Sequence, residues 1–227
     1  MSIYIISLGG SIIVPNGSID TKFLKSFNTF IRSRVKNGDR FVIITGGGGV
    51  AREYQRAAKG VARLTRDDLD WLGIHATRMN AHLLRTIFRD IARPVICKDP
   101  SRIKSTSKYP LIIAAGWKPG WSTDYVATRI AKRLKAAMVV NLSNIDYVYD
   151  KDPKKYKTAK KLEEVTWPEF RKIVGNKWDP GLNVPFDPVA SRLAHKEGIP
   201  VSILNGKDLQ NLGRMLDGKA FKGTRVK

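Results

Sequence analysis

The stretch Arg40-Phe-Val-Ile-Ile-Thr-Gly-Gly-Gly-Gly-Val-Ala-Arg-Glu-Tyr54 combines three local signals from which the rest of the chain can be interpreted. Its first half is a short apolar, β-branched run, which predicts a buried strand. Gly46 to Gly49 follow, and Val50 begins an amphipathic helical pattern. A strand, a glycine loop and a helix are typical of a phosphate cradle, because glycine permits close approach and a helix N-terminus offers free N–H groups. The alternative is a tight turn without a ligand.

Arg52 stands near the start of this predicted helix, where its guanidinium could hydrogen-bond the same phosphate. The loop matches neither of the common phosphate-binding patterns. A Walker loop requires Gly-x-x-x-x-Gly-Lys-Ser/Thr, and the sequence contains no such run. A dinucleotide fingerprint requires spaced glycines near the N-terminus and an acidic residue about 20 residues later, which fits poorly. The sequence therefore indicates a third kind of nucleotide enzyme.

The length of 227 residues suits one α/β domain, and we assign residues 1–227 to it. No apolar run approaches the ~20 residues of a membrane span, and the N-terminus lacks the basic start and cleavage site of a signal peptide. Cys97 is the only cysteine, which excludes an internal disulfide and fits a reducing compartment. We therefore expect a cytoplasmic protein with no membrane partner and with Cys97 as a packed thiol.

The net charge of +21 raises the question of a polyanionic partner. Such a balance can indicate nucleic-acid binding. Here the charge is spread along the chain, with its densest run at residues 151–161, and the sequence shows no basic helix with interleaved aromatic residues. We favour a solvated basic surface, or a general attraction for polyanionic substrates, over a nucleic-acid partner.

Strand and helix patterns alternate along almost the whole chain. Apolar runs predict strands over residues 3–6, 40–45, 94–98, 111–115, 137–142 and 201–204. Helical periodicity fills most of the segments between them. This alternation predicts an α/β fold with a mostly parallel sheet covered by helices on both faces.

A long helix is predicted from Leu64, with Thr65 and Asp68 as a capping box. Apolar residues at helical spacing are expected in its core-facing stripe: Leu72, Ala76, Met79, Leu83 and Ile87. His75 and His82 lie seven apart on the same helix. Zinc ligands on a helix prefer closer spacing, so we interpret both as structural or surface residues.

Ligands of parallel sheets bind beyond the carboxyl ends of the strands. Four predicted loops occupy those ends, at residues 7–11, 46–52, 116–124 and 143–152. We expect these loops to converge on one crevice.

Taken in this order, the loops resemble those of the amino acid kinase superfamily, and most of all its archaeal-type uridylate (UMP) kinases. The resemblance covers essentially the whole chain. It rests on seven motifs in register: Leu8-Gly-Gly-Ser-Ile-Ile-Val-Pro15, Gly46-Gly-Gly with Ala51-Arg52, Asp70-Trp-Leu-Gly-Ile-His-Ala-Thr-Arg-Met-Asn80, Ser122-Thr-Asp124, Asn144-Ile-Asp146 with Val148-Tyr149 and Asp152-Pro153, Asp187-Pro188, and Gly223-Thr224.

The resemblance implies a three-layer α/β/α sandwich. It also implies transfer of the γ-phosphoryl group of ATP to UMP, giving UDP and ADP, with Mg²⁺. Members of this family are usually cytoplasmic homohexamers that act in pyrimidine nucleotide synthesis. ATP, UMP and further copies of the chain are therefore the expected partners.

Roles for individual residues are implied by the matching positions. ATP binding is implied for Gly9, Gly10, Ser11, Gly48, Arg52, Ser143, Asn144, Tyr149 and Asp152. UMP binding is implied for Gly47, Asp70, Trp117, Lys118, Pro119, Gly120, Trp121, Ser122 and Thr123. Asp124 and Asp187 are expected to organise the charged groups around the reaction or to hold Mg²⁺, with helix capping as the alternative. For Asp70 the alternative is a charge that favours the helix dipole.

Such a site requires no covalent nucleophile, because a phosphoryl group in transfer carries spread negative charge that positioned amides, cations and Mg²⁺ stabilise. Many superfamily members carry a lysine where this chain has Ser7, and other departures are Gly49, Tyr147 after Asp146, and the two tryptophans of the 116–124 loop. Which cation acts is therefore open, and we expect Arg52 and Lys118 to share the catalytic role with the two aspartates.

Two other functions remain open at the level of sequence. One is a superfamily kinase with a different small acceptor, and the other is a non-catalytic nucleotide sensor or storage protein on the same fold. Residues 219–227 carry four Lys or Arg and are expected to form a surface end rather than a site.

Overall fold

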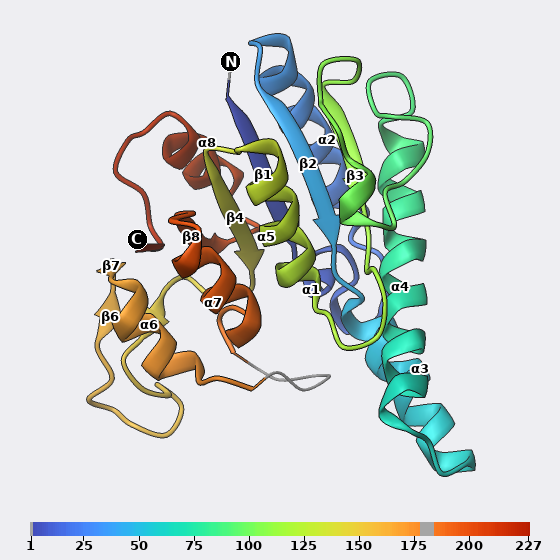
Figure 1. Cartoon of the computed structure of the whole chain (residues 1–227), viewed down its shortest axis with the longest axis vertical. Coiled ribbons are helices and arrows are strands. Elements are labelled where there is room, and N and C mark those ends of the chain that lie inside the picture. The colour runs from blue at the N-terminus through green and yellow to red at the C-terminus, as the bar shows by residue number, and fades with distance from the viewer. Residues whose placement is uncertain (1, 178–183) are drawn as a thin grey trace.

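The computed structural model describes residues 2–177 and 184–227. Its centre is a seven-stranded sheet with the order β3-β2-β1-β4-β8-β9-β7 (Figure 1). In chain order these strands are β1 Ile3–Leu8, β2 Arg40–Thr45, β3 Leu111–Ala114, β4 Met138–Ser143, β7 Glu164–Val165, β8 Val201–Asn205 and β9 Thr224–Val226. The five strands from β3 to β8 are parallel, and β9 is antiparallel to β8. A separate hairpin pairs β5 (Val148–Tyr149) with β6 (Lys161–Leu162).

Helices cover both faces of the sheet, which gives the expected three layers. They are α1 Gly10–Ile13, α2 Thr21–Lys36, α3 Gly48–Val61, α4 Arg66–Ile87, α5 Thr123–Leu134, α6 Trp167–Val174, α7 Pro188–Lys196 and α8 Leu209–Leu216, with short 3₁₀ turns at Pro15–Gly17 and Pro100–Arg102. Among these described helices, none has the length and apolar character needed to cross a membrane.

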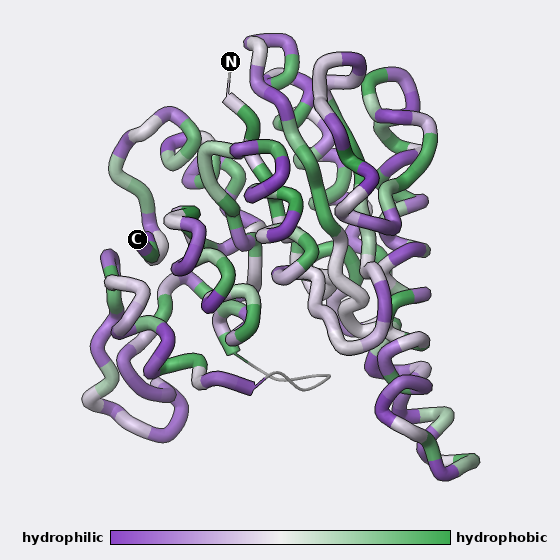
Figure 2. The backbone as a smooth tube through the Cα atoms, in the orientation of Figure 1, coloured by the Kyte–Doolittle hydropathy of each residue, from purple (hydrophilic) through white to green (hydrophobic). Residues whose placement is uncertain are grey.

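Alternate residues of each central strand enter two different cores. Ile6 and Ile43 pack with α1, α2, α4 and α8, whereas Ile5 and Val42 pack with α5, α6 and α7. Because successive side chains of a strand point to opposite faces, a strand buried on both faces must be apolar almost throughout. Figure 2 shows the resulting apolar tracts along the central strands.

Side chains cap the starts of several helices, and the predicted capping box of α4 is confirmed. Asp20 Oδ1 accepts the Phe23 N–H at 2.9 Å, and Thr65 with Asp68 forms the full capping box at the start of α4. Ser122 Oγ caps α5 through the Tyr125 N–H at 3.1 Å.

Two expectations about secondary structure and packing were wrong. Residues 94–98 form no strand; Cys97 makes only an isolated bridge to Ala114. Pro94 has no N–H to donate to a ladder, and the segment follows the edge strand β3 for too short a distance. The Cys97 thiol is packed as expected, and its burial raises its pKa. Met79 is 71% exposed rather than in the core, because it lies about 140° around α4 from the buried Ile74.

The C-terminal segment is also more ordered than expected. Residues 224–226 form β9, which inserts between β8 and β7, and both Thr224 and Val226 are fully buried. This segment therefore belongs to the sheet, although the lysines before it are on the surface.

Candidate active site

The glycine loops that follow β1 and β2 pack directly against each other. The Gly46 N–H donates to the Leu8 carbonyl at 2.8 Å, and a Cβ on Gly46 would lie 2.6 Å from the Gly10 nitrogen. Gly48 has a φ of +64°, and a Cβ there would overlap the Gly10 backbone. The loops meet this closely only because these positions are glycine.

The loop after β4 reaches the same place through Gly9. The Gly9 N–H donates to the Leu142 carbonyl at 2.8 Å, and a Cβ on Gly9 would be 3.7 Å from Ser143 Cα. The Ser143 carbonyl in turn accepts the Gly206 N–H at 2.8 Å. The structure therefore brings together three of the loops at the carboxyl ends of the strands, as predicted.

Helix α4 holds these loops from one side through Asn80 and Thr77, two residues without a predicted role. Asn80 Nδ2 donates to the Gly46 carbonyl at 2.8 Å. Thr77 Oγ1 accepts the Gly116 N–H at 2.8 Å, while its carbonyl accepts from Thr45 Oγ1 at 2.9 Å. Both side chains are buried polar groups with partners, so α4 fixes the relative positions of the β2 and β3 loops.

The loop after β3 is fixed to α4 at two further points. Asp70 Oδ2 accepts the Gly120 N–H at 2.7 Å, and Arg78 donates to the Trp117 carbonyl at 3.0 Å. A cavity of about 520 Å³ opens beside these contacts, lined by Arg66, Asp67, Asp70, Pro119, Gly120, Asn176, Lys177 and Val189. Its volume falls within the usual range for small-molecule sites. Asn176 and Lys177 had no sequence signal, because they belong to none of the recognisable motifs.

Aromatic rings pack together within and next to the loop after β3. Trp121 stacks on Tyr125 with ring centroids 4.1 Å apart, and Trp117 lies 6.2 Å from Trp121. The exposed Lys118 ammonium lies 4.6 Å from the centre of the Trp117 ring. Among the described contacts Lys118 has this ring as its neighbour and no carboxylate, so its charge remains available to an anion.

Asp124 sits at the centre of a hydrogen-bonded network behind the loops. Its Oδ1 accepts from Ser7 Oγ at 2.7 Å and from Asn141 Nδ2 at 3.2 Å, and its Oδ2 accepts the Asp187 N–H at 3.2 Å. Burial of the carboxyl, with the Asp187 charge as a further contribution, raises the pKa of Asp124 to about 7. Within the described residues it forms no ion pair.

Asp187 caps α7, which was the alternative reading for this residue. Its Oδ1 accepts the Ala190 N–H at 2.6 Å, and it also hydrogen-bonds with Ser122. The side chain is buried, and this burial raises its pKa. Asp187 and Asp124 thus form a pair of adjacent acidic groups where the ends of β1 and β4 meet α5 and α7.

The loop between β4 and β5 is anchored by the C-terminal segment. Asp146 accepts from Asn205 Nδ2 at 2.9 Å and pairs with the Lys222 ammonium at 2.6 Å. The Val148 N–H donates to Thr224 Oγ1 at 2.8 Å. These contacts place Asn144 at an exposed position and Tyr149, half-buried, on the β5–β6 hairpin. Asp152 is exposed and accepts the Lys154 N–H at 2.9 Å.

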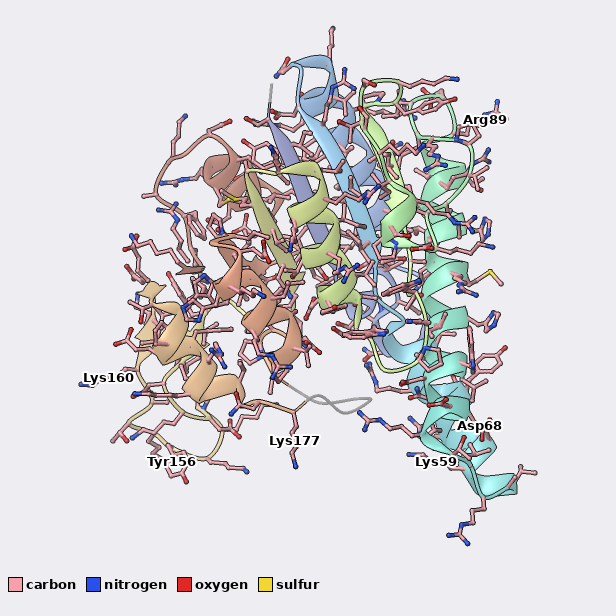
Figure 3. The ribbon with its side chains drawn as sticks, viewed as in Figure 1. Lys59, Asp68, Arg89, Tyr156, Lys160 and Lys177 are labelled. Carbon is pink, nitrogen blue, oxygen red and sulfur yellow. The ribbon has the colours of Figure 1, made fainter. Side chains whose placement is uncertain are left out.

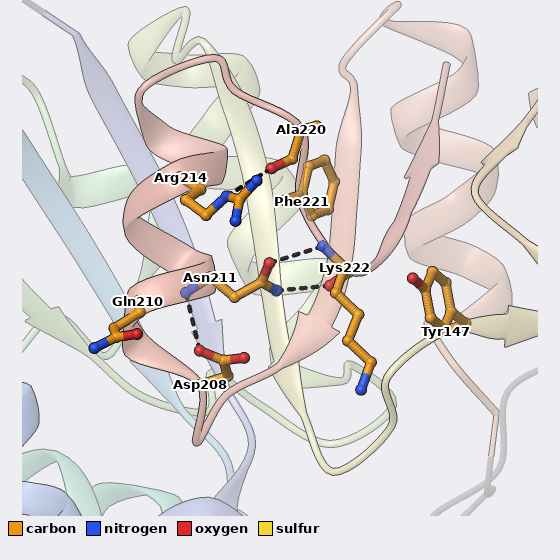
Figure 4. Close-up of a pocket in the computed structure, with 8 residues that line it drawn as sticks. All are labelled: Tyr147, Asp208, Gln210, Asn211, Arg214, Ala220, Phe221 and Lys222. Atoms are coloured by element: carbon orange, nitrogen blue, oxygen red, sulfur yellow. Dashed lines mark hydrogen bonds between the residues drawn. The ribbon is translucent and has the colours of Figure 1, made fainter.

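A second cavity, of about 420 Å³, lies beside this anchor and contains none of the predicted site residues (Figure 4). Its wall is built around Asn211, which donates to the Lys222 carbonyl and accepts the Lys222 N–H, both at 2.7 Å. The Tyr147 ring borders the cavity from the loop between β4 and β5.

Of the two expected cations, Arg52 lies one turn into α3 with its side chain exposed. The other glycine-loop positions, Ser11 and Gly47, are half-buried at the same edge of the sheet. The structure therefore places the glycine loops, Asp70 and Asp124 near the carboxyl ends of β1 to β4, whereas Tyr149 and Asp152 belong to the β5–β6 hairpin and its connection. It shows direct contact for the glycines, for Asp70 with Gly120, and for Asp124 with Asp187.

Comparison with known proteins assigns this arrangement to a class. The family model of the amino acid kinase family matches residues 2–205. The chain therefore belongs to the amino acid kinase family.

Within this family, the chain is similar along its whole length to several uridylate kinases. Uridylate kinase from Methanocorpusculum labreanum is 32% identical over 100% of this chain and 96% of its own length, and uridylate kinase from Thermoplasma volcanium is 35% identical over 98% and 96%. The crystal structure of uridylate kinase from Archaeoglobus fulgidus superposes with a TM-score of 0.85 at 29% identity, covering both chains completely. UMP kinase from Bacillus anthracis shares the fold at 19% identity, with a TM-score of 0.77 over 100% of this chain and 96% of its own.

Proposed function

We propose that the protein is a UMP kinase, which transfers the γ-phosphoryl group of ATP to UMP and releases UDP and ADP in pyrimidine nucleotide synthesis. The observation that carries this proposal is the contact between the glycine loops of β1 and β2, together with a cavity lined by Asp70, Pro119 and Gly120. Similarity to uridylate kinases along the whole chain supports it. An oxygen of the UMP phosphate attacks the γ-phosphorus, and the bond to the ADP oxygen breaks.

UMP occupies the cavity between α4 and the loop after β3 in this proposal. Asp70 accepts a hydrogen bond from the ribose or base, and Gly47 contacts the nucleotide. The loop of residues 117–123 encloses it: Trp117, Lys118, Pro119, Gly120, Trp121, Ser122 and Thr123, with Thr123 donating to the phosphate. The bonds from α4 to Gly120 and Trp117 support this role, because a fixed loop loses less entropy when it binds a ligand.

ATP lies on the other side of the glycine loops. Gly9, Gly10 and Ser11 line the transferring phosphate, with Gly48 and Arg52 facing the phosphates between the two nucleotides. Adenine and ribose contact the loop after β4 through Ser143, Asn144, Tyr149 and Asp152. The packing of Gly9 against Ser143 supports one continuous ATP site across these loops.

The residues present fit a magnesium ion carried by ATP. The described part of the chain holds no cluster of three metal-binding side chains, but Mg²⁺ in kinases is usually held by substrate phosphates with one or two carboxylates. Asp124 and Asp187 are a buried acidic pair that forms no ion pair among residues 2–177 and 184–227, and a cation would stabilise their charges. When bound, the ion neutralises charge on the phosphates.

Lys118 and Arg52 supply the remaining positive charge in this proposal. A transferring phosphoryl group requires cations near its oxygens. Both side chains are exposed at the edge of the site, and neither forms an ion pair among the described residues.

Self-association completes the proposal. Four large apolar side chains of α3 and α4 are exposed: Tyr54, Val61, Trp71 and Met79. The C-terminal end of α3 and the start of α4 project from the body of the molecule, with Lys59 and Asp68 in this part (Figure 3). We assign this surface to contacts between copies of the chain in a cytoplasmic homohexamer, since grouped apolar side chains mark association sites. A nucleic-acid partner is not favoured.

A coupled assay with ATP, Mg²⁺ and a panel of nucleoside monophosphates tests the function directly. Turnover of UMP above all others is expected. Activity on CMP or AMP with none on UMP would reject the acceptor, and nucleotide binding without any turnover would instead support a sensor or storage protein on this fold.

A further inference from the structure

Two buried polar residues interrupt strands that are otherwise apolar. Ser7 stands in the β1 run Ile3-Tyr-Ile-Ile-Ser-Leu8 and is 4% exposed, and Asn141 stands in the β4 run Met138-Val-Val-Asn-Leu-Ser143 and is 6% exposed. In a parallel sheet covered on both faces, such positions are usually apolar. A buried polar side chain needs a hydrogen-bond partner to offset its lost hydration.

The register of the sheet places these two side chains together. Ser7 and Asn141 are direct partners in the parallel pairing of β1 with β4. They follow Ile5 and Val139 by two residues, so they point toward the same face, which α5 covers. One neutral donor on each strand therefore reaches the same point beneath the first turn of α5.

That point is a single oxygen of Asp124. The Ser7 hydroxyl and the Asn141 amide both donate to Oδ1, at 2.7 and 3.2 Å, while the backbone N–H of Asp187 donates to Oδ2 at 3.2 Å. Both oxygens are thus oriented by neutral donors. Among residues 2–177 and 184–227 no Lys or Arg pairs with this carboxyl.

We infer that Ser7 and Asn141 are positioning residues for phosphoryl transfer, which fix the Asp124 carboxyl with two neutral hydrogen bonds. This inference rests on the proposed kinase function. Asp124 follows the loop that encloses the acceptor and contacts the start of α7, so its orientation sets how the two acidic groups face the transferring phosphoryl group. Both residues act through Asp124, whose carboxyl they contact directly.

The role predicts a specific kinetic signature. Hydrogen bonds to charged groups have a free energy that corresponds to roughly ten- to a hundredfold in rate. Ser7→Ala should lower kcat at least about tenfold, with KM for UMP and ATP within about twofold of wild type, because the loss acts on the transition state. Asn141→Leu should act in the same direction, and Ser7→Thr, which keeps the hydroxyl, should restore most of the rate.

Ser202→Ala is the matched control. Ser202 is 1% exposed on β8 of the same sheet and has no hydrogen bond to Asp124 in the described structure. This variant should keep wild-type kinetics. A double-mutant cycle separates positioning from general destabilisation: in an Asp124→Asn background, Ser7→Ala should change kcat less than about twofold.

The outcomes separate this inference from the function on which it rests. A wild-type kcat in Ser7→Ala, or an equally large loss in the Asp124→Asn background, would overturn the positioning role and leave the kinase function standing. Absence of UMP turnover by the wild-type protein would reject the kinase function, and the positioning role with it.

Discussion

At Asp70, one carboxylate oxygen is already engaged by the protein, because Oδ2 accepts the Gly120 N–H at 2.7 Å in a side chain that is only 7% exposed. In the proposed function the residue therefore both positions the loop and recognises UMP. Asp70→Ala should raise KM for UMP about tenfold or more while KM for ATP stays unchanged. Asp70→Asn keeps an acceptor for the Gly120 N–H, so its KM for UMP should lie between those of the wild type and of Asp70→Ala. An equal rise in both KM values would show that the residue serves the fold alone.

Lys118 and Arg52 have different surroundings, so substitutions of the two residues should have different kinetic effects. The Lys118 ammonium faces the Trp117 ring, and partial exclusion of water by that ring strengthens its electrostatic effect. Lys118→Met keeps most of the stem and should lower kcat at least ~10-fold with nucleotide binding nearly unchanged. Arg52→Ala should lower kcat/KM by roughly ten- to a hundredfold. Wild-type steady-state kinetics in either folded variant would show that the residue is a solvent-facing side chain without a role in catalysis.

At the scale of elements, the junction of the β2 loop with α3 depends on Gly48. Its φ of +64° is unfavourable for any residue with a Cβ, and that Cβ would overlap the Gly10 backbone. Gly48→Ala should lower the thermal midpoint by several degrees and abolish activity, since the two loops must separate. Gly60→Ala is the control on the same helix. No atom lies within 4 Å of its Cβ position, so it should leave stability unchanged or slightly increased. Equal midpoints for both variants in a thermal melt would contradict this account.

For the whole molecule, the exposed apolar surface of α3 and α4 predicts an assembly. Met79→Glu together with Val61→Glu should shift the protein toward the 25.4 kDa monomer in light scattering, because a charge buried in an apolar interface lacks a partner. Tyr156→Glu, at the exposed 151–161 loop, should leave the mass unchanged. A wild-type protein that is itself monomeric would reject the homohexamer.

The extent of prediction from sequence follows from how local each signal is. The strands around Ile5 and Val42 and the cap at Thr65 are encoded within a few neighbouring residues, and the structure confirms them. Strand β9 was not predicted from the sequence, because its three residues follow a basic stretch and pair with a distant strand.

The same contrast holds at the site. The glycine loops were predicted because motif spacing reveals them, and the contact of Gly10 with Gly48 bears out their convergence. Asn80 ends one of the motifs, but the motif does not reveal its bond to Gly46. Lys177 and Lys222 belong to no motif, and only tertiary packing brings them to the loops. The departure at Ser7 was visible in the sequence, but its partner Asn141 required the strand register.

The position of β9 has a consequence for biosynthesis. This strand is translated after every other strand of the sheet, yet it lies between β8 and β7, and Thr224 holds the start of the β5–β6 hairpin. Domains form as the ribosome releases the chain from its N-terminal side, at about 5–20 residues per second. The half of the sheet that carries the glycine loops can therefore assemble early, whereas the hairpin bearing Tyr149 waits for the last strand to emerge. Nascent chains that stop before Thr224 should remain catalytically silent, so that nucleotide turnover begins only once synthesis has passed this point.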